Sequence, residues 1–433
     1  MDSKKLELTQ SYSLLDRARD LIPGVAQTFS KGPTQIVQGV SPLYLERGQG
    51  SHVWDVDGNE FIDYPTSLGP IVLGHNDPDV SKAVIEQISK GTVFSLSSPI
   101  ELDVAETLID AIPCADMVRY GKNGSDVTSA AVRVSRAFTG RDIVALSGYH
   151  GWQDWYIGTT TRNAGVPAAV SDLSKKYVYG DTASLEKLFA EYPDQIACVI
   201  MEPVGVVEPA EGYLQATKDL CKKNGALLIF DEVLTGFRIA YGGAQERYGV
   251  VPDLACYAKA LANGYPLSVI GGRRDVMELF DEIFFSFTFG GDAISLAASQ
   301  ATLAKMQSEP VFEHLWRQGQ KLQDGYNSLA RENGVGDFTS CIGLAPRTVA
   351  TFSDPESGHD SPALRSLIQQ ELVRRGVLFL FGFNISYSVS DADVDHTLEA
   401  LRAAMGVVAS AIDSGDVESW VDGKIVKPVF RQA

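Results

Sequence analysis

Several features are scarce or missing in this sequence of 433 residues. Its five cysteines are scattered, and none form the CxxC pair typical of a zinc site or a redox dithiol, so we expect reduced thiols and no bound metal. No run of about 18 apolar residues occurs, so no membrane-spanning helix is expected. The chain begins with a polar stretch instead of the apolar core of a signal peptide, which favours a cytoplasmic protein.

The chain also has fewer basic than acidic residues. Lysine and arginine total 37 against 55 aspartates and glutamates, which gives a formal net charge of -18. Such a charge repels phosphate backbones and anionic lipid surfaces, so neither nucleic acid nor a membrane is an expected partner. With 45% apolar and 21% charged residues the composition is that of a globular protein, and the length predicts two or three packed units.

Two suggestive motifs are incomplete. The turn at residues 55–58 is similar to the start of a calcium loop, but Thr66 stands where such a loop requires Glu, so we predict a structural turn. An apolar strand that ends in Asp231 and Glu232 is similar to the magnesium-binding strand of a P-loop ATPase, but the chain has no GxxxxGKS/T phosphate loop. Neither a calcium site nor an ATPase is therefore expected.

The apolar pattern changes twice along the chain. It predicts an N-terminal segment with a β-hairpin over residues 1–70 that is part of the small domain, a large domain over 71–310 and a C-terminal small α+β domain over 311–433. In the large domain short apolar strands alternate with helices, which is typical of an α/β fold with a mainly parallel sheet covered by helices on both faces. The expected strands are 116–120, 143–146, 197–201, 226–230, 254–257 and 267–271.

Three motifs follow strands of this predicted sheet. Gly124 and Ser125 open a helix, and the first backbone N–H groups of a helix can bind a phosphate. Asp231 follows another strand, at the edge where parallel sheets bind ligands. Lys259 follows the next strand, where partial burial can turn an amine into a nucleophile for a carbonyl. Alone, each motif is more often a helix cap, a capping acid or a surface lysine.

Together the three motifs meet the needs of pyridoxal phosphate. Its phosphate binds N–H donors, its ring nitrogen needs an anion to stay protonated, and its aldehyde needs an amine. Tyr149, after a further strand, offers an aromatic side chain that could stack on the ring or simply fill the core.

At this point the chain resembles the class III pyridoxal-phosphate aminotransferases of fold type I. The matching words occur in the family's order at residues 54–58, 73–75, 123–126, 148–151, 201–204 and 231–238 and at Lys259. The resemblance is closest to the glutamate-1-semialdehyde 2,1-aminomutase branch. It implies catalytic roles for Lys259, as the Schiff-base lysine, and for Asp231, as the partner of the pyridine nitrogen. It also implies cofactor contacts from Gly124, Ser125, Tyr149 and Val233.

The resemblance also implies a homodimer with shared active sites. Thr288 matches the threonine that reaches the phosphate from the second subunit. The family pattern continues there with Asn-Pro, whereas this chain has Asp292-Ala293, which leaves the local backbone open. Glu202 and Glu232 match family positions and are given supporting roles.

Three features on the substrate side differ from the aminomutase. The loop after Gly151 is several residues shorter than the aminomutase gating loop, residues 25–31 contain no arginine but only Lys31, and the expected glutamate is missing from residues 380–384. We therefore predict an aminotransferase with a small-molecule amino donor and a carbonyl acceptor, such as an oxo-sugar of surface-polysaccharide biosynthesis.

Other interpretations stay open. An isomerase of the same fold, either the aminomutase or an amino-acid epimerase, would need no second substrate. A non-enzymatic protein on a dead transferase fold is disfavoured by the intact Lys259, Asp231 and phosphate motif. The aromatic side chains of Trp152, Trp155 and Tyr156 suit either substrate contact or a dimer interface.

Overall fold

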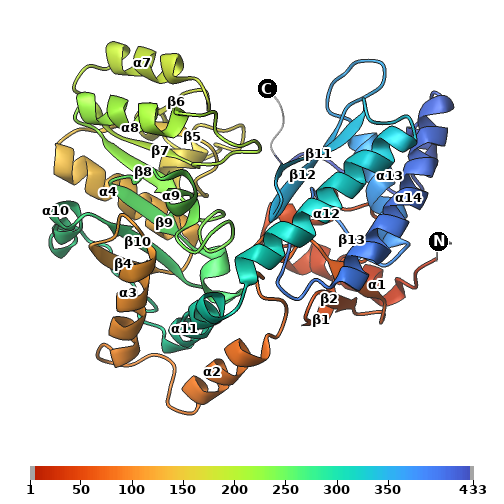
Figure 1. Ribbon diagram of the computed structural model, residues 1–433, viewed down its shortest axis with the longest axis horizontal. Helices are drawn as coiled ribbons and strands as arrows, with labels where there is room; N and C mark the ends of the chain where they lie inside the picture. The colour runs from red at the N-terminus through yellow and green to blue at the C-terminus, as the bar shows by residue number, and fades with distance from the viewer. Residues whose placement is uncertain (1–4, 430–433) are drawn as a thin grey trace. The chain divides into compact units, whose positions relative to one another are not determined.

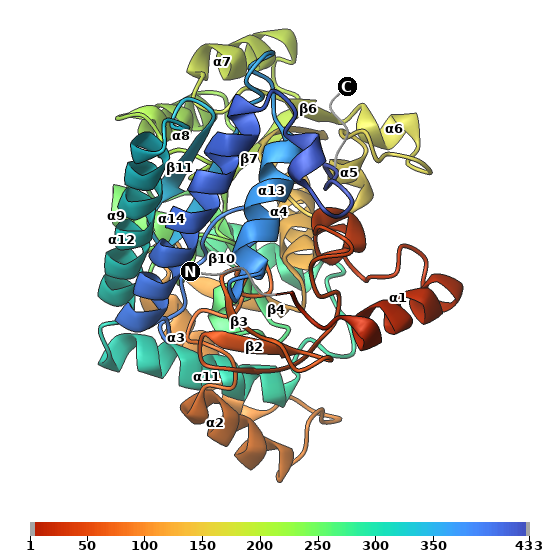
Figure 2. The same cartoon turned by 90° about the vertical axis from the view of Figure 1, so that its right-hand side faces the viewer.

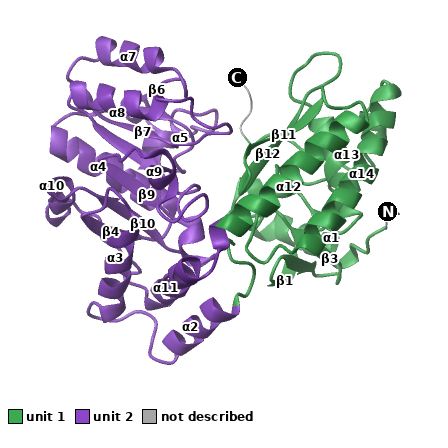
Figure 3. Ribbon diagram, viewed as in Figure 1, with its two compact units in different colours: residues 1–77, 313–431 green, residues 78–312, 432–433 purple. Residues whose placement is uncertain are grey.

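The computed structural model describes residues 5–429 and has the predicted α/β architecture (Figure 1). The chain forms two compact units (Figure 3). The first consists of residues 1–77 and 313–431, and the second of residues 78–312 with 432–433. Among the described residues, no helix has both the length and the apolar character needed to cross a membrane.

A seven-stranded sheet forms the centre of the second unit, in the order β4-β10-β9-β8-β7-β5-β6. Neighbouring strands from β9 to β6 pair in parallel, whereas β10 runs antiparallel to β4 and β9. The prediction of a mainly parallel sheet is thus confirmed. The strands are β4 (Met117–Gly121), β5 (Ile143–Ser147), β6 (Ser174–Lys176), β7 (Ile196–Met201), β8 (Leu227–Asp231), β9 (Leu254–Tyr257) and β10 (Ser268–Gly272).

Helices surround this sheet because its central strands are apolar on both faces. Helix α4 begins at Gly124, where the Asp126 carboxylate accepts a hydrogen bond of 2.7 Å from the backbone N–H of Asn123. It ends at Gly140, whose φ of 66° suits glycine. The helices are α2 (Pro78–Ile88), α3 (Pro99–Ala111), α4 (Gly124–Thr139), α5 (Asp154–Ile157), α6 (Ala168–Ser171), α7 (Thr182–Glu191), α8 (Tyr213–Lys223), α9 (Gly243–Tyr248), α10 (Arg274–Met277) and α11 (Ala293–Ser308).

The first unit combines both ends of the chain (Figure 2). Strand β13 pairs in parallel with β3, so a C-terminal strand completes the N-terminal sheet β1-β2-β3-β13. The predicted turn is held by Asp55, whose Oδ1 accepts backbone N–H groups of Asp57 and Asn59 at 3.0 and 2.7 Å. Its elements are α1 (Thr9–Leu21), β1 (Leu45–Gln49), β2 (His52–Asp55), β3 (Glu60–Asp63), α12 (Val311–Glu332), β11 (Thr339–Leu344), β12 (Arg347–Phe352), α13 (Pro362–Val373), β13 (Val377–Leu378) and α14 (Asp391–Asp413).

Candidate active site

Asp231 is the last residue of β8 and lies at the carboxyl edge of the sheet. Its side chain is 4% exposed. Its Oδ2 lies 2.7 Å from Nδ1 of His150, and its Oδ1 accepts a hydrogen bond of 3.1 Å from the backbone N–H of Val233. A buried carboxylate held by two polar partners has a fixed direction, so it can pair with a cationic ligand atom.

His150 is a site residue that the sequence analysis did not single out. It follows β5 and is 1% exposed, and its Nε2 lies 3.2 Å from the carbonyl oxygen of Ser147. The ring of His150 therefore lies between the end of β5 and the Asp231 carboxylate, and fixes the direction of that carboxylate. The sequence signal that could have identified His150 is its place next to Tyr149, three residues after the end of β5.

Lys259 starts a short 3-10 helix (η3, Lys259–Ala262) just beyond β9. Strand β9 pairs in parallel with β8, and Cys256 lies opposite Asp231 in the register, so Lys259 follows the strand end next to the carboxylate. The φ of Lys259 is 46°, in the left-handed region, which costs a residue other than glycine about 1 kcal/mol. Strained backbone of this kind clusters at functional sites.

The phosphate motif lies at the start of α4, close to two further loops. A Cβ atom on Gly124 would lie 3.0 Å from both methyl groups of Val233, so only a residue without a side chain permits this approach. Ser125 accepts a hydrogen bond of 3.3 Å from the backbone N–H of Trp152, which leaves its hydroxyl proton for another partner. The first N–H groups of α4 have no acceptor within the helix. The structure thus brings Gly124, Ser125 and Val233 together around an anion-binding helix end.

Tyr149 presents an accessible ring. It is 53% exposed, and its ring lies edge-to-face on Tyr156 with 5.4 Å between the centroids. Its backbone N–H donates a hydrogen bond of 3.0 Å to Oε2 of Glu202. Partial burial, together with the charges of Asp231 and Glu202, raises the pKa of Tyr149, which keeps the side chain a neutral phenol. The alternative role of Tyr149 as core filler does not fit this exposure.

The aromatic segment after Gly151 is part of the core. Trp155 and Tyr156 are 7% and 6% exposed, and Nε1 of Trp155 donates a hydrogen bond of 2.9 Å to the hydroxyl of Ser129. Both rings pack against His150, with centroid separations of 6.1 and 5.5 Å. Of the three aromatic residues considered for substrate contact or a dimer interface, Trp152 is the exposed one, and the other two hold His150 in place.

Thr288 lies in an exposed turn that precedes α11. Asp292 ends the turn and caps α11, since its Oδ1 accepts a hydrogen bond of 3.1 Å from the backbone N–H of Ile294. Its Oδ2 lies 3.0 Å from Nζ of Lys122, two residues before Gly124. With Asp292-Ala293 in place of Asn-Pro, α11 therefore begins at a capped residue, and that residue forms an ion pair with Lys122.

Glu232, next to Asp231, has a structural environment. It is fully buried, and it accepts hydrogen bonds from the backbone N–H groups of Ala244 and Gln245 at 2.8 and 3.1 Å and from the hydroxyl of Thr235 at 2.5 Å. Burial raises its pKa to about 7, although these hydrogen bonds act in the opposite direction. Glu232 thus fastens α9 to the end of β8.

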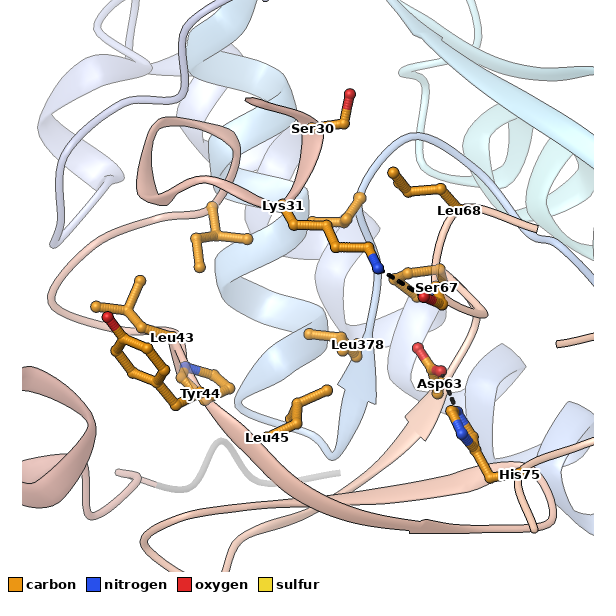
Figure 4. A pocket seen from close by; sticks show the side chains of 14 residues that line it. Ser30, Lys31, Leu43, Tyr44, Leu45, Asp63, Ser67, Leu68, His75 and Leu378 are labelled. Carbon is orange, nitrogen blue, oxygen red and sulfur yellow. Dashed lines mark hydrogen bonds and ion pairs between the residues drawn. The ribbon is translucent and has the colours of Figure 1, made fainter. Parts of the chain in front are cut away.

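The first unit contains a pocket of about 340 Å³ (Figure 4). Its walls are mostly apolar, and Lys31 extends across it to donate a hydrogen bond of 2.6 Å to the Ser67 hydroxyl. The nearby Asp63 lies 2.7 Å from Nε2 of His75. Within residues 5–429 no carboxylate comes within ion-pair distance of the Lys31 ammonium, and partial burial lowers its pKa. The apolar lining consists of Ile36, Pro42, Leu43, Leu45, Pro65, Leu68, Leu378 and Leu380.

A strained turn lines this pocket. Thr66, Ser67 and Leu68 have φ values of 42°, 57° and 72°, so three consecutive residues other than glycine adopt the left-handed conformation. Each costs about 1 kcal/mol relative to a relaxed backbone. Strain of this extent beside a pocket is typical of a ligand-binding segment.

Comparison with known proteins decides what this arrangement belongs to. Residues 36–405 match the family described as aminotransferase class III. The chain belongs to this family. A 3-aminobutyryl-CoA aminotransferase of Cloacimonas acidaminovorans is 34% identical over 418 residues, which cover 94% of this chain and 99% of the relative. A glutamate-1-semialdehyde 2,1-aminomutase of Desulforamulus reducens is 35% identical over 427 residues, which cover 92% of this chain and 98% of the relative.

The class III aminotransferase fold is also found among solved structures. The PLP internal aldimine form of the FumI protein from Sphingopyxis sp. MTA144 matches with a TM-score of 0.87 and 28% identity, covering 95% of this chain and 100% of that chain. The predictions of fold type I, of the enzyme class and of pyridoxal phosphate (PLP) as cofactor are thereby confirmed.

The residues at the sheet edge fit PLP. The start of α4 offers N–H donors and the Ser125 hydroxyl to a phosphate, and the approach of Val233 to Gly124 leaves no room for a side chain there. The buried Asp231 offers a carboxylate to the ring nitrogen, and Lys259 offers an amine two residues beyond the neighbouring strand. When bound, the cofactor supplies an aldehyde and an electron-withdrawing ring for amino-group chemistry.

Proposed function

We propose that this aminotransferase moves an amino group between two different molecules, an amino donor and a carbonyl acceptor, and that Lys259 and Asp231 are its catalytic residues. The observation that supports this most directly is the parallel pairing of β8 and β9, with Cys256 opposite Asp231. This register puts the anion and the amine of PLP chemistry on adjacent strand ends.

Each residue has a definite task in this proposal. Lys259 Nζ would hold the cofactor aldehyde and would serve as the base that moves a proton at the amine-bearing carbon of the substrate. Asp231 Oδ would pair with the ring nitrogen. Gly124 and Ser125 would bind the phosphate, and Val233 and Tyr149 would contact the ring.

The segment after Gly151 supports transfer between molecules over isomerisation. In the aminomutase branch the intermediate stays bound behind a long gating loop. Here the corresponding segment is several residues shorter, and its part that forms α5 (Asp154–Ile157) is anchored in the core through Trp155 and Tyr156. Isomerisation is the second candidate, because the relative from Desulforamulus reducens is named as an aminomutase.

The substrates are proposed from the two units separately. The pocket of the first unit, with one ammonium and apolar walls, suits the carboxylate and aliphatic part of an amino-acid donor. For the acceptor we retain an oxo-sugar, since exposed Tyr149 and Trp152 offer aromatic surfaces of the kind that pack against sugar rings. We also propose a homodimer in which Thr288 serves the other subunit, and a cytoplasmic location that keeps the buried cysteines reduced.

A substrate screen tests the proposed function. Purified enzyme loaded with PLP is incubated with amino-acid donors, and the keto acid released is measured with and without oxo-sugar acceptors. We expect one equivalent of keto acid without acceptor and continuous turnover with it. Conversion of a single amino compound at full rate without any keto acid would favour the isomerase, and a wild-type protein that binds no PLP would refute both candidates.

A further inference from the structure

Lys122 joins the segments that surround the proposed phosphate site. Its side chain is 15% exposed, and its ammonium donates hydrogen bonds of 3.0 Å to Oδ2 of Asp292 and 3.1 Å to the carbonyl oxygen of Pro266. Its backbone N–H donates to Oδ2 of Asp126 at 3.0 Å, as the N–H of Asn123 does at 2.7 Å. One residue thus connects the turn before α4 with the start of α11 and with the turn that follows Lys259.

The carboxylate of Asp292 creates the need for this ammonium. Although burial favours the neutral acid, hydrogen bonds from Ser295 and Lys122 hold the pKa of Asp292 below its ordinary value, so the side chain is ionised. Asp292 lies four residues after Thr288 and directly before α11. An unpaired carboxylate in this loop would repel a phosphate dianion.

We propose that Lys122 is a positioning residue for the cofactor phosphate: it cancels the charge of Asp292 and fixes the start of α11 to the turn before α4. The inference rests on the proposed phosphate roles of Gly124 and Ser125. In the first unit Lys31 donates a hydrogen bond to a neutral hydroxyl. The ammonium of Lys122 instead contacts a carboxylate and a carbonyl oxygen, so the charge of Lys122 is balanced within the protein.

The test measures cofactor affinity instead of turnover. Apoenzyme is titrated with PLP and, separately, with pyridoxal, the same aldehyde without the phosphate. Lys122→Met should raise the Kd for PLP about tenfold, because one charged hydrogen bond is lost and Asp292 is left uncompensated. The Kd for pyridoxal should stay unchanged, because pyridoxal carries no phosphate to be repelled.

A second substitution separates charge from folding. In Lys122→Met with Asp292→Asn the repelling carboxylate is gone while an asparagine can still cap α11, so the Kd for PLP should return to within about threefold of the wild-type value. Lys223→Met, at an exposed position of α8, is the matched control and should bind PLP like the wild type.

Three results would overturn the inference: wild-type PLP affinity in Lys122→Met, equal losses for PLP and pyridoxal, or a double variant as weak as Lys122→Met. Failure of the wild-type protein to bind PLP would instead refute the proposed function. The two failures are therefore distinguishable.

Discussion

The two units place polar side chains in different ways. In the second unit Asp231 and His150 sit at strand ends, almost fully buried, and each has two polar partners. In the first unit Lys31 is exposed, makes its hydrogen bond to one neutral hydroxyl, and faces a strained turn at residues 66–68. The comparison shows that the second unit fixes its polar side chains at strand ends through several partners, whereas the first unit presents Lys31 from a loop through one hydrogen bond.

The largest effect is expected from Lys259→Ala. It removes the amine that follows the strand next to Asp231, so turnover should fall by at least about 10⁴-fold. Keto-acid release from an amino donor measures this, and the circular dichroism spectrum should match that of the wild type. Lys223→Ala, on the exposed face of α8, is the control. Transamination by Lys259→Ala at the wild-type rate would contradict the catalytic role of Lys259, and with it the assignment of the cofactor site to the second unit.

Asp231→Ala should lower kcat about 100- to 1,000-fold, because the ring nitrogen loses the charge that favours its protonated form. The cofactor should still become attached to Lys259, which borohydride reduction followed by mass spectrometry detects. Normal turnover in this variant would contradict the role of Asp231.

His150→Phe should have a smaller effect, a loss of about tenfold in kcat. Asp231 keeps the N–H of Val233 but loses its imidazole partner, while the phenyl ring can still pack between Trp155 and Tyr156. The pH profile of kcat should also shift relative to the wild type. An unchanged pH profile and an unchanged kcat would show that the contact with His150 does not influence Asp231.

Glu232→Gln tests the buried carboxyl group of Glu232 through the pH dependence of stability. The pKa of Glu232 is raised to about 7 from 4.5, so the folded state binds this proton more tightly than the unfolded chain does. The resulting stability is complete below the unfolded pKa and is lost as pH rises through about 7. Between pH 5 and pH 8 the free energy of unfolding should therefore fall by about 2 to 3 kcal/mol more in the wild type than in Glu232→Gln. Urea titrations at both pH values provide the measurement. If the free energy of unfolding fell equally in the wild type and in Glu232→Gln, the raised pKa of Glu232 would be contradicted.

The smallest effect concerns the strained turn. Ser67→Gly should raise the free energy of unfolding by about 0.5 to 1 kcal/mol, since glycine adopts a φ of 57° without strain. Ser410→Gly, at an exposed position of α14, is the matched control and should lower it by about 0.5 kcal/mol. If both variants were destabilised equally, the turn at residues 66–68 would not be storing strain.

Most of the sheet could be predicted because its strands are short apolar runs between helical patterns. Strand β6 was missed, since Ser174, Lys175 and Lys176 give no apolar signal at the sheet edge. The antiparallel direction of β10 was also not predicted, because an apolar run reads alike in either direction. Burial of Trp155 and Tyr156 depends on contacts with His150 that no local pattern reveals.

The candidate residues at the strand ends could be named from the sequence because each motif follows a strand directly. The ion pair between Lys122 and Asp292 could not, since 170 residues separate the partners and no local pattern shows that they meet. The strained turn also left no signal, because its residues 66–68 include no glycine to mark a left-handed backbone.

The thiol next to the proposed anion has a chemical consequence. Cys256 lies opposite Asp231 in the register, is fully buried, and has its pKa raised well above the ordinary value by that burial. Thiolates add readily to aldehydes, but a thiol kept protonated in an apolar environment does not. The sheet can therefore carry sulfur one strand away from a reactive carbonyl without diverting it into a dead-end adduct.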